Sequence, residues 1–72
     1  MISFIEWTMM DSVGRARAYL DGFTHQREQT GRELIGAGYT SGQARAFQDG
    51  ADAARRGDAR LAEIMRRVYN LD

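Results

Sequence analysis

The segment GRARAYLDG at residues 14–22 returns 28 residues later as GQARAFQDG at residues 42–50. Six of the nine positions are identical, and Tyr19 is replaced by another aromatic residue, Phe47. Either a helical unit has been duplicated, or the match is a coincidence within a chain rich in Ala, Arg, Gly and Asp. Two copies are too few for a solenoid, in which at least three repeats must stack. The repeat therefore predicts two similar helices packed side by side.

A turn rich in Gly separates the two copies. Residues 36–39, GAGY, include two glycines, and either can adopt the left-handed conformation that ends a helix. Thr40 and Gln43 then match a capping box, the signature of a new helix start. A short turn usually makes consecutive helices antiparallel neighbours. We therefore predict an all-α antiparallel hairpin, with one helix over about 3–36, a turn over 36–40 and a second helix over about 41–71.

The first half of the chain has the pattern of an amphipathic helix. Ser3 and Glu6 fit a capping box at its start. Apolar residues then recur at steps of three and four, which places them on one helix face; they are Ile5, Met9, Val13, Ala16, Leu20 and Phe23. Residues 24–33, THQREQTGRE, are polar, so we expect this part of the helix to be solvated and less stable.

The second half has an apolar row at seven-residue spacing, formed by Phe47, Ala54, Leu61 and Val68. The row keeps its phase across Gly57-Asp58, which favours a continuous helix. A break at Gly57, with Asp58 capping a separate last helix, is the alternative. In an antiparallel hairpin folded at Gly38, Leu20 faces Gly57 and Ala16 faces Leu61, so large side chains oppose small ones.

Length and composition favour association. The 72 residues form one domain, residues 1–72, which is too short to bury a large core without a staple or a partner. The sequence holds no Cys and one His, which excludes a disulfide, a thiolate metal site and a His-rich metal site within the chain. Residues 1–10 are more apolar than one helix face requires. We expect two hairpins to pair as a four-helix-bundle homodimer; alternatively, Trp7 and Met10 cover the end of the second helix within one chain.

Residues suited to catalysis do not cluster in the sequence. His25 lies in the polar stretch, and Asp21 and Asp49, at the same place in the two copies, are explained by pairing with Arg17 and Arg45. We therefore expect no enzyme activity, metal, cofactor or small-molecule substrate. No apolar run approaches the roughly 20 residues of a membrane span. The first residues also lack a secretory signal, which predicts a cytoplasmic protein.

Exposed aromatic residues and Arg are the common contact residues of protein interfaces. We expect Trp7, Met10, Tyr39 and Tyr69 to bind a partner protein. Tyr39 stands at the predicted hairpin tip, where a hydrophobic cap on the turn is the alternative role.

The ten basic residues are all Arg and are balanced by ten acidic residues. A neutral chain has no global field to attract nucleic acid. Arg56, Arg60 and Arg67 nevertheless share one face of the predicted second helix, which is a candidate for contact with nucleic acid or an acidic partner. Because Asp52 and Asp58 lie among them, a solvated face of mixed charge is the alternative.

The segments GRARAYLDG and GYTSGQARAFQDG resemble those of small proteins encoded in the early regions of temperate phages. In size and predicted hairpin, the chain resembles the phage anti-quorum-sensing proteins. Those are dimeric helical hairpins that bind the DNA-binding domain of a LuxR-type transcription activator and can also bind a type IV pilus assembly ATPase. The resemblance implies a non-enzymatic regulator that binds and inhibits a host protein in the host cytoplasm, and it identifies no functional residue. The alternative function is a dimeric nucleic-acid-binding regulator that uses the Arg face.

Overall fold

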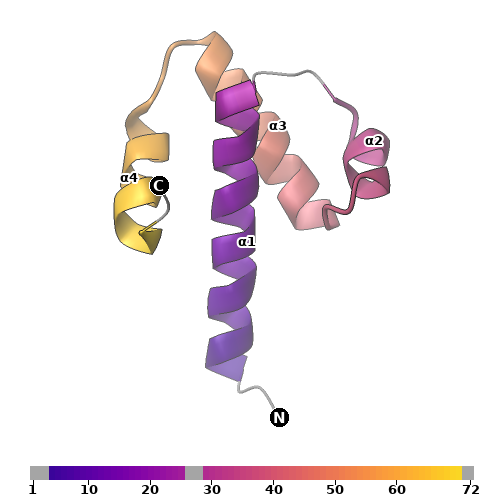
Figure 1. Ribbon diagram of the computed structural model, residues 1–72, viewed down its shortest axis with the longest axis vertical. Coiled ribbons are helices and arrows are strands. Elements are labelled where there is room, and N and C mark those ends of the chain that lie inside the picture. The colour runs from indigo at the N-terminus through magenta and orange to yellow at the C-terminus, as the bar shows by residue number, and fades with distance from the viewer. Residues whose placement is uncertain (1–3, 26–28, 71–72) are drawn as a thin grey trace.

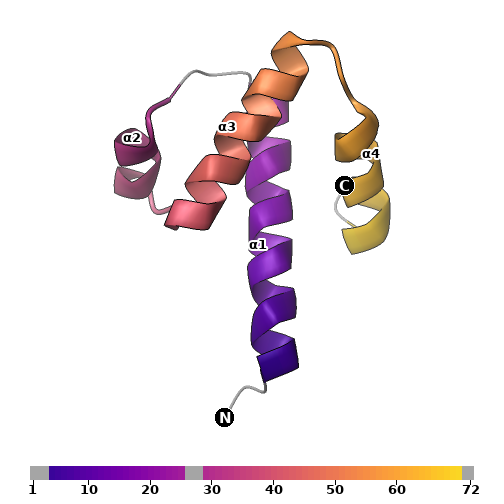
Figure 2. The ribbon, with the colours of Figure 1, turned by 180° about the vertical axis from the view of Figure 1, so that it is seen from behind.

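The computed structural model describes residues 4–25 and 29–70, and the side chains of residues 12–25 and 29–70. Within these ranges the chain is all-helical, as predicted, and forms four helices: α1 (Phe4–His25), α2 (Gly31–Gly36), α3 (Ser41–Arg55) and α4 (Arg60–Tyr69). α1 and α3 cross at the centre of the molecule, and α2 and α4 lie on opposite sides of this pair (Figures 1 and 2).

The structure has two helices, α1 and α2, where the sequence predicted one helix over about 3–36. Thr30 begins the second of them. Its Oγ1 accepts a hydrogen bond from the Glu33 N–H at 3.2 Å, and the Glu33 carboxylate accepts one from the Thr30 N–H at 3.3 Å. This capping box satisfies backbone groups that a new helix start would otherwise leave without partners. The predicted cap at Ser3 lies outside the described residues.

A tight turn joins α2 to α3. Gly38 has a φ of 107°, and its N–H donates to the Ile35 carbonyl at 3.0 Å. The Tyr39 N–H donates to the Leu34 carbonyl at 3.1 Å, which completes a Schellman turn. The predicted capping box between Thr40 and Gln43 is confirmed, and it opens α3.

α3 ends in a second Schellman turn. Gly57 has a φ of 71°, and the N–H of Asp58 donates to the Ala53 carbonyl at 2.9 Å. Asp58 then accepts a hydrogen bond from the Arg60 N–H at 3.2 Å where α4 begins. The second helix is therefore broken near Gly57, which was the alternative in the sequence. A Cβ atom at Gly57 would meet open space, so the predicted packing of Leu20 against Gly57 is wrong.

The central pair differs in direction from a simple hairpin. α1 and α3 run the same way, and α4 runs back along α1 (Figures 1 and 2). The short α2 and the segments beside it bring the chain back before α3 starts, so that α3 can run parallel to α1. A single turn over 36–40 would make the two helices antiparallel. Antiparallel packing is thus found between α1 and α4, whereas the largest helix contact is between α1 and α3.

α1 and α3 touch through their backbones at two glycines. Gly22 lies against the Phe47 carbonyl, and Gly50 lies against the Tyr19 carbonyl. Gly22 corresponds to Gly50 in the repeat, and Tyr19 to Phe47, so the two contacts are equivalent. An approximate two-fold axis therefore relates α1 to α3.

The equivalence extends beyond the crossing. Leu34 of α2 and Ala62 of α4, which are 28 residues apart, are both 0% exposed. Thr30 and Asp58, also 28 residues apart, both accept a backbone N–H at the start of a helix. The repeat thus continues in three dimensions as two copies of a longer helix followed by a shorter one. The two starts differ in detail, since Thr30 is the N-cap of α2, whereas the N-cap of α4 is Ala59. This agreement favours duplication over coincidence.

The glycine crossing predicts the effect of adding one methyl group. Gly22→Ala or Gly50→Ala should each destabilise the fold by about 3 kcal/mol, because the Cβ would overlap a backbone carbonyl that cannot move aside. Gly36→Ala is the control, since a Cβ there meets nothing within 4 Å, and it should change stability by less than about 1 kcal/mol. Urea unfolding followed by circular dichroism gives the values. Equal midpoints for Gly22→Ala and Gly36→Ala would contradict the close crossing.

Candidate functional site

Three apolar side chains of α4 face solvent. Leu61 is 46% exposed, Ile64 54% and Val68 67%. Their spacing of three and four residues places them on one side of the helix, and we call them the α4 stripe. The other side of α4 packs on the core, where Ala62 is buried and Met65 contacts the cluster around Tyr19. α4 is therefore apolar on two sides, and the described residues cover only one of them.

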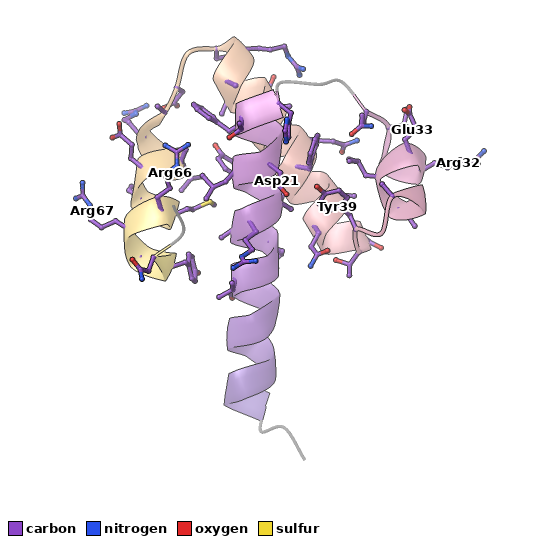
Figure 3. All side chains as sticks on the ribbon, in the orientation of Figure 1. Asp21, Arg32, Glu33, Tyr39, Arg66 and Arg67 are labelled. Carbon is purple, nitrogen blue, oxygen red and sulfur yellow. The ribbon has the colours of Figure 1, made fainter. Side chains whose placement is uncertain are left out.

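Arg side chains border the α4 stripe. Arg60 and Arg67 are seven residues apart, which places them on the same edge of α4, next to the stripe. Arg60 is held by Asp58, with Nε and Oδ1 3.3 Å apart. This hydrogen bond and ion pair lower the pKa of the Asp58 carboxyl and raise that of Arg60. Arg67 points away from the protein (Figure 3).

The predicted Arg face is divided. Arg56 lies at the end of α3, on the far side of the turn at Gly57 from Arg60 and Arg67. Its guanidinium pairs with Asp52, with Nη2 and Oδ2 3.1 Å apart. The three Arg residues therefore do not share one helix, and two of them have a carboxylate partner. Contact of this face with nucleic acid stays a prediction.

The predicted aromatic residues have different surroundings. Tyr39 is half-buried, with its ring edge on Phe47 at a centroid distance of 5.5 Å. Its hydroxyl donates to Asp21 Oδ2 at 3.1 Å, and the two side chains point toward each other (Figure 3). Tyr39 thus packs on the core next to the turn. Tyr69 is 36% exposed, and the side chains of Trp7 and Met10 lie outside the described residues.

A groove of about 490 Å³ lies between α1, α3 and α4. Its apolar wall is formed by Ala16 and Tyr19 of α1, Ala46 of α3, and Leu61, Met65 and Tyr69 of α4. Charged residues at the groove are Arg15, Asp49, Asp52 and Arg56. Because Leu61 belongs to both the groove and the α4 stripe, the two form one continuous surface.

Tyr19 carries a hydroxyl group in this groove. Its side chain is 6% exposed, and burial is the largest cause that raises its pKa. The carboxylates of Asp58, Asp49 and Asp52 raise it further, and Arg56 lowers it. The phenol is therefore neutral at physiological pH, and the groove combines apolar walls with groups that donate and accept hydrogen bonds. This chemistry suits binding.

Comparison with known proteins gave no match to a family model, a curated protein or a solved structure. In the described part of the chain, no three His, Cys, Asp or Glu residues come together to hold a metal ion. None of the helices in residues 4–25 and 29–70 is both long and apolar enough to cross a membrane.

Sequence reasoning did not find the α4 stripe or the groove. It assigned Leu61 and Val68 to the core of one long hairpin, because the apolar row keeps its phase across Gly57. The available signal was Gly57-Asp58 itself, a left-handed turn residue followed by a helix cap. A break there rotates α4, so that Leu61 and Val68 face solvent while Phe47 of α3 stays buried.

The raised pKa of Tyr19 predicts a loss of stability in alkali. The folded state holds the phenol proton more tightly than the unfolded chain, whose tyrosine pKa is near 10.0. The stabilisation is therefore complete below about pH 9 and is lost as the pH rises through the folded-state pKa. In Tyr19→Phe, urea unfolding between about pH 8 and pH 11 should show a smaller loss than in wild type. Equal losses in wild type and Tyr19→Phe would contradict the assignment.

Proposed function

We propose that this protein is a non-enzymatic regulator that binds another protein through the α4 stripe. The observation that supports the proposal is the exposure of Leu61, Ile64 and Val68 on one face of a regular helix. Contiguous exposed apolar side chains are costly in water and mark interaction sites. An amphipathic helix that lies in a groove of its partner is a common recognition mode.

The charges around the stripe define the partner further. Arg60 and Arg67 border the apolar residues, so a complementary surface is apolar at its centre and carries carboxylates at that edge. From the resemblance to phage anti-quorum-sensing proteins, the proposed target is a host regulatory protein. The first target to test is the DNA-binding domain of a LuxR-type activator, and the second is a type IV pilus assembly ATPase. Binding would inhibit the target by occupying the surface that it needs for its own function.

The proposal predicts that one charge in the α4 stripe abolishes binding. Ile64→Asp or Val68→Asp should weaken the affinity for the purified target at least about tenfold, because a carboxylate would be buried in an apolar contact. Ile35→Asp is the matched control, since Ile35 of α2 is 53% exposed and lies away from the stripe, and it should bind like wild type. Isothermal titration calorimetry measures the affinities, and circular dichroism checks the fold. Equal loss in Ile35→Asp, or no loss in Ile64→Asp, would contradict the proposal.

The proposed regulator is a homodimer that pairs through the N-terminal half of α1. The N-terminal half of α1 extends beyond the other three helices (Figures 1 and 2). The sequence of this segment, FIEWTMM at residues 4–10, is largely apolar. A second copy that packs along this segment would remove it from water through a symmetric interface.

The dimer has its own test, separate from target binding. Light scattering on the wild-type protein should give twice the mass of the chain, and Trp7→Glu should give the mass of a single chain, because it places a charge in the apolar interface. Ile64→Asp should remain dimeric, because the α4 stripe is proposed to bind the target and not the second copy. A wild-type protein that is monomeric at all concentrations would exclude the dimer without affecting the target proposal.

A further inference from the structure

We infer that the groove between α1, α3 and α4 is a binding site for a tyrosine side chain of the partner protein. This inference rests on the proposed function, because it names the contact that anchors the partner. It follows from the two-fold relation between the halves of the chain: the equivalent position in the first half holds a tyrosine of the chain itself.

Tyr39 shows how this kind of site binds a phenol. Its ring packs on the cluster that contains Ala18, Ala44 and Phe47, with an edge contact to the Phe47 ring. Its hydroxyl donates to Asp21 Oδ2 at 3.1 Å. One aromatic ring, two alanine methyl groups, the Leu34 side chain and one carboxylate thus make up the surroundings of the tyrosine.

The groove repeats four of these five residues 28 positions away; the fifth, Leu34, corresponds to Ala62 of the second core. Phe47 corresponds to Tyr19, and Asp21 corresponds to Asp49. The methyl groups of Ala18 and Ala44 correspond to those of Ala46 and Ala16. All four equivalents, Ala16, Tyr19, Ala46 and Asp49, line the groove. Because the contacts at Gly22 and Gly50 are reciprocal, these residues also have equivalent placements on α1 and α3.

Helix length explains why only the first half has a tyrosine at this position. α2 has 6 residues, and the turn at Gly38 brings Tyr39 back onto the core. α4 has 10 residues and continues as a helix through Arg67, the residue that corresponds to Tyr39. Arg67 points away from the groove (Figure 3). Tyr69 forms part of the groove wall, but no tyrosine of this chain stands at the position equivalent to Tyr39. A tyrosine in that place would come from another molecule.

Two features favour a partner protein as its source. Asp49 is exposed and has no hydrogen-bond or ion-pair partner among the described residues, so its carboxylate is available to accept a phenol O–H. Leu61 joins the groove to the α4 stripe. A tyrosine in the groove would then lie next to the apolar contact that the rest of the partner makes. Buried aromatic anchors of this kind dominate the energetics of many interfaces.

The test uses p-cresol, which has the structure of the tyrosine side chain, and toluene, which lacks the hydroxyl. Both are titrated into the isotopically labelled full chain and followed by NMR. We expect p-cresol to shift the amides of Tyr19, Ala46 and Asp49 and to bind about tenfold more tightly than toluene, because only p-cresol can donate to the carboxylate. Asp49→Ala should remove this preference. Asp21→Ala is the matched control, since it deletes the equivalent carboxylate in the first half, and it should keep the preference.

Several results would overturn the inference. Shifts confined to other residues, or a preference for p-cresol that survives in Asp49→Ala, would show that the groove does not recognise the phenol. Dissociation of a homodimer by p-cresol would assign the site to a tyrosine of a second copy instead. Loss of target binding in Ile64→Asp together with no binding of p-cresol would reject the groove site and retain the proposed function. Binding of p-cresol without any effect of Ile64→Asp on the target would reject the proposed function instead.

Discussion

The backbone contact of α1 with α3 at Gly22 and Gly50 determines the rest of the structure. With no side chain at either position, the two helices approach until the main chain of one touches the carbonyl of the other. At this distance Tyr19 and Phe47 cannot lie between the helices, and each contributes to a separate small core. α2 covers the core with Phe47, and α4 covers the core with Tyr19. The protein is therefore built as two half-cores around one crossing, an economical arrangement for a chain of 72 residues.

Local signals in the sequence predicted the ends of several helices. The capping box at Thr40 forms as its spacing indicates, because the hydrogen bonds that define it lie within four residues. Thr30 and Glu33 have the same spacing, yet the polar stretch around them was interpreted as a weak part of one helix. The separation of α1 from α2 determines the direction of α3, because it allows the chain to turn back before α3 begins.

Long-range packing could not be predicted in the same way. The sequence pattern predicted that Gly57 packs against Leu20 of the first helix. Its open surroundings and positive φ show instead that it is a turn residue. Gly50 does have a packing role, but its neighbour is Tyr19, which is 31 positions away in the sequence and is reached only through parallel packing. The repeat contained this information, because equivalent glycines in two copies can meet equivalent carbonyls. Periodicity alone does not distinguish that arrangement from an antiparallel one.

The differences between the two halves are where function is expected to lie. At the equivalent buried positions, Leu34 anchors α2 with a large side chain, and Ala62 anchors α4 with a methyl group. A groove lies beside α4, between it and α1 and α3. The longer α4 also carries three exposed apolar residues on a side that the described part of the chain leaves uncovered. Duplication explains why the two halves share the same arrangement of helices. In the first half, α2 is short and the following Tyr39 packs on the core. In the other half, the equivalent aromatic residue Tyr19 lines a groove, the Asp49 carboxylate is exposed, and an apolar helix face lies beside them. A partner protein can use this combination.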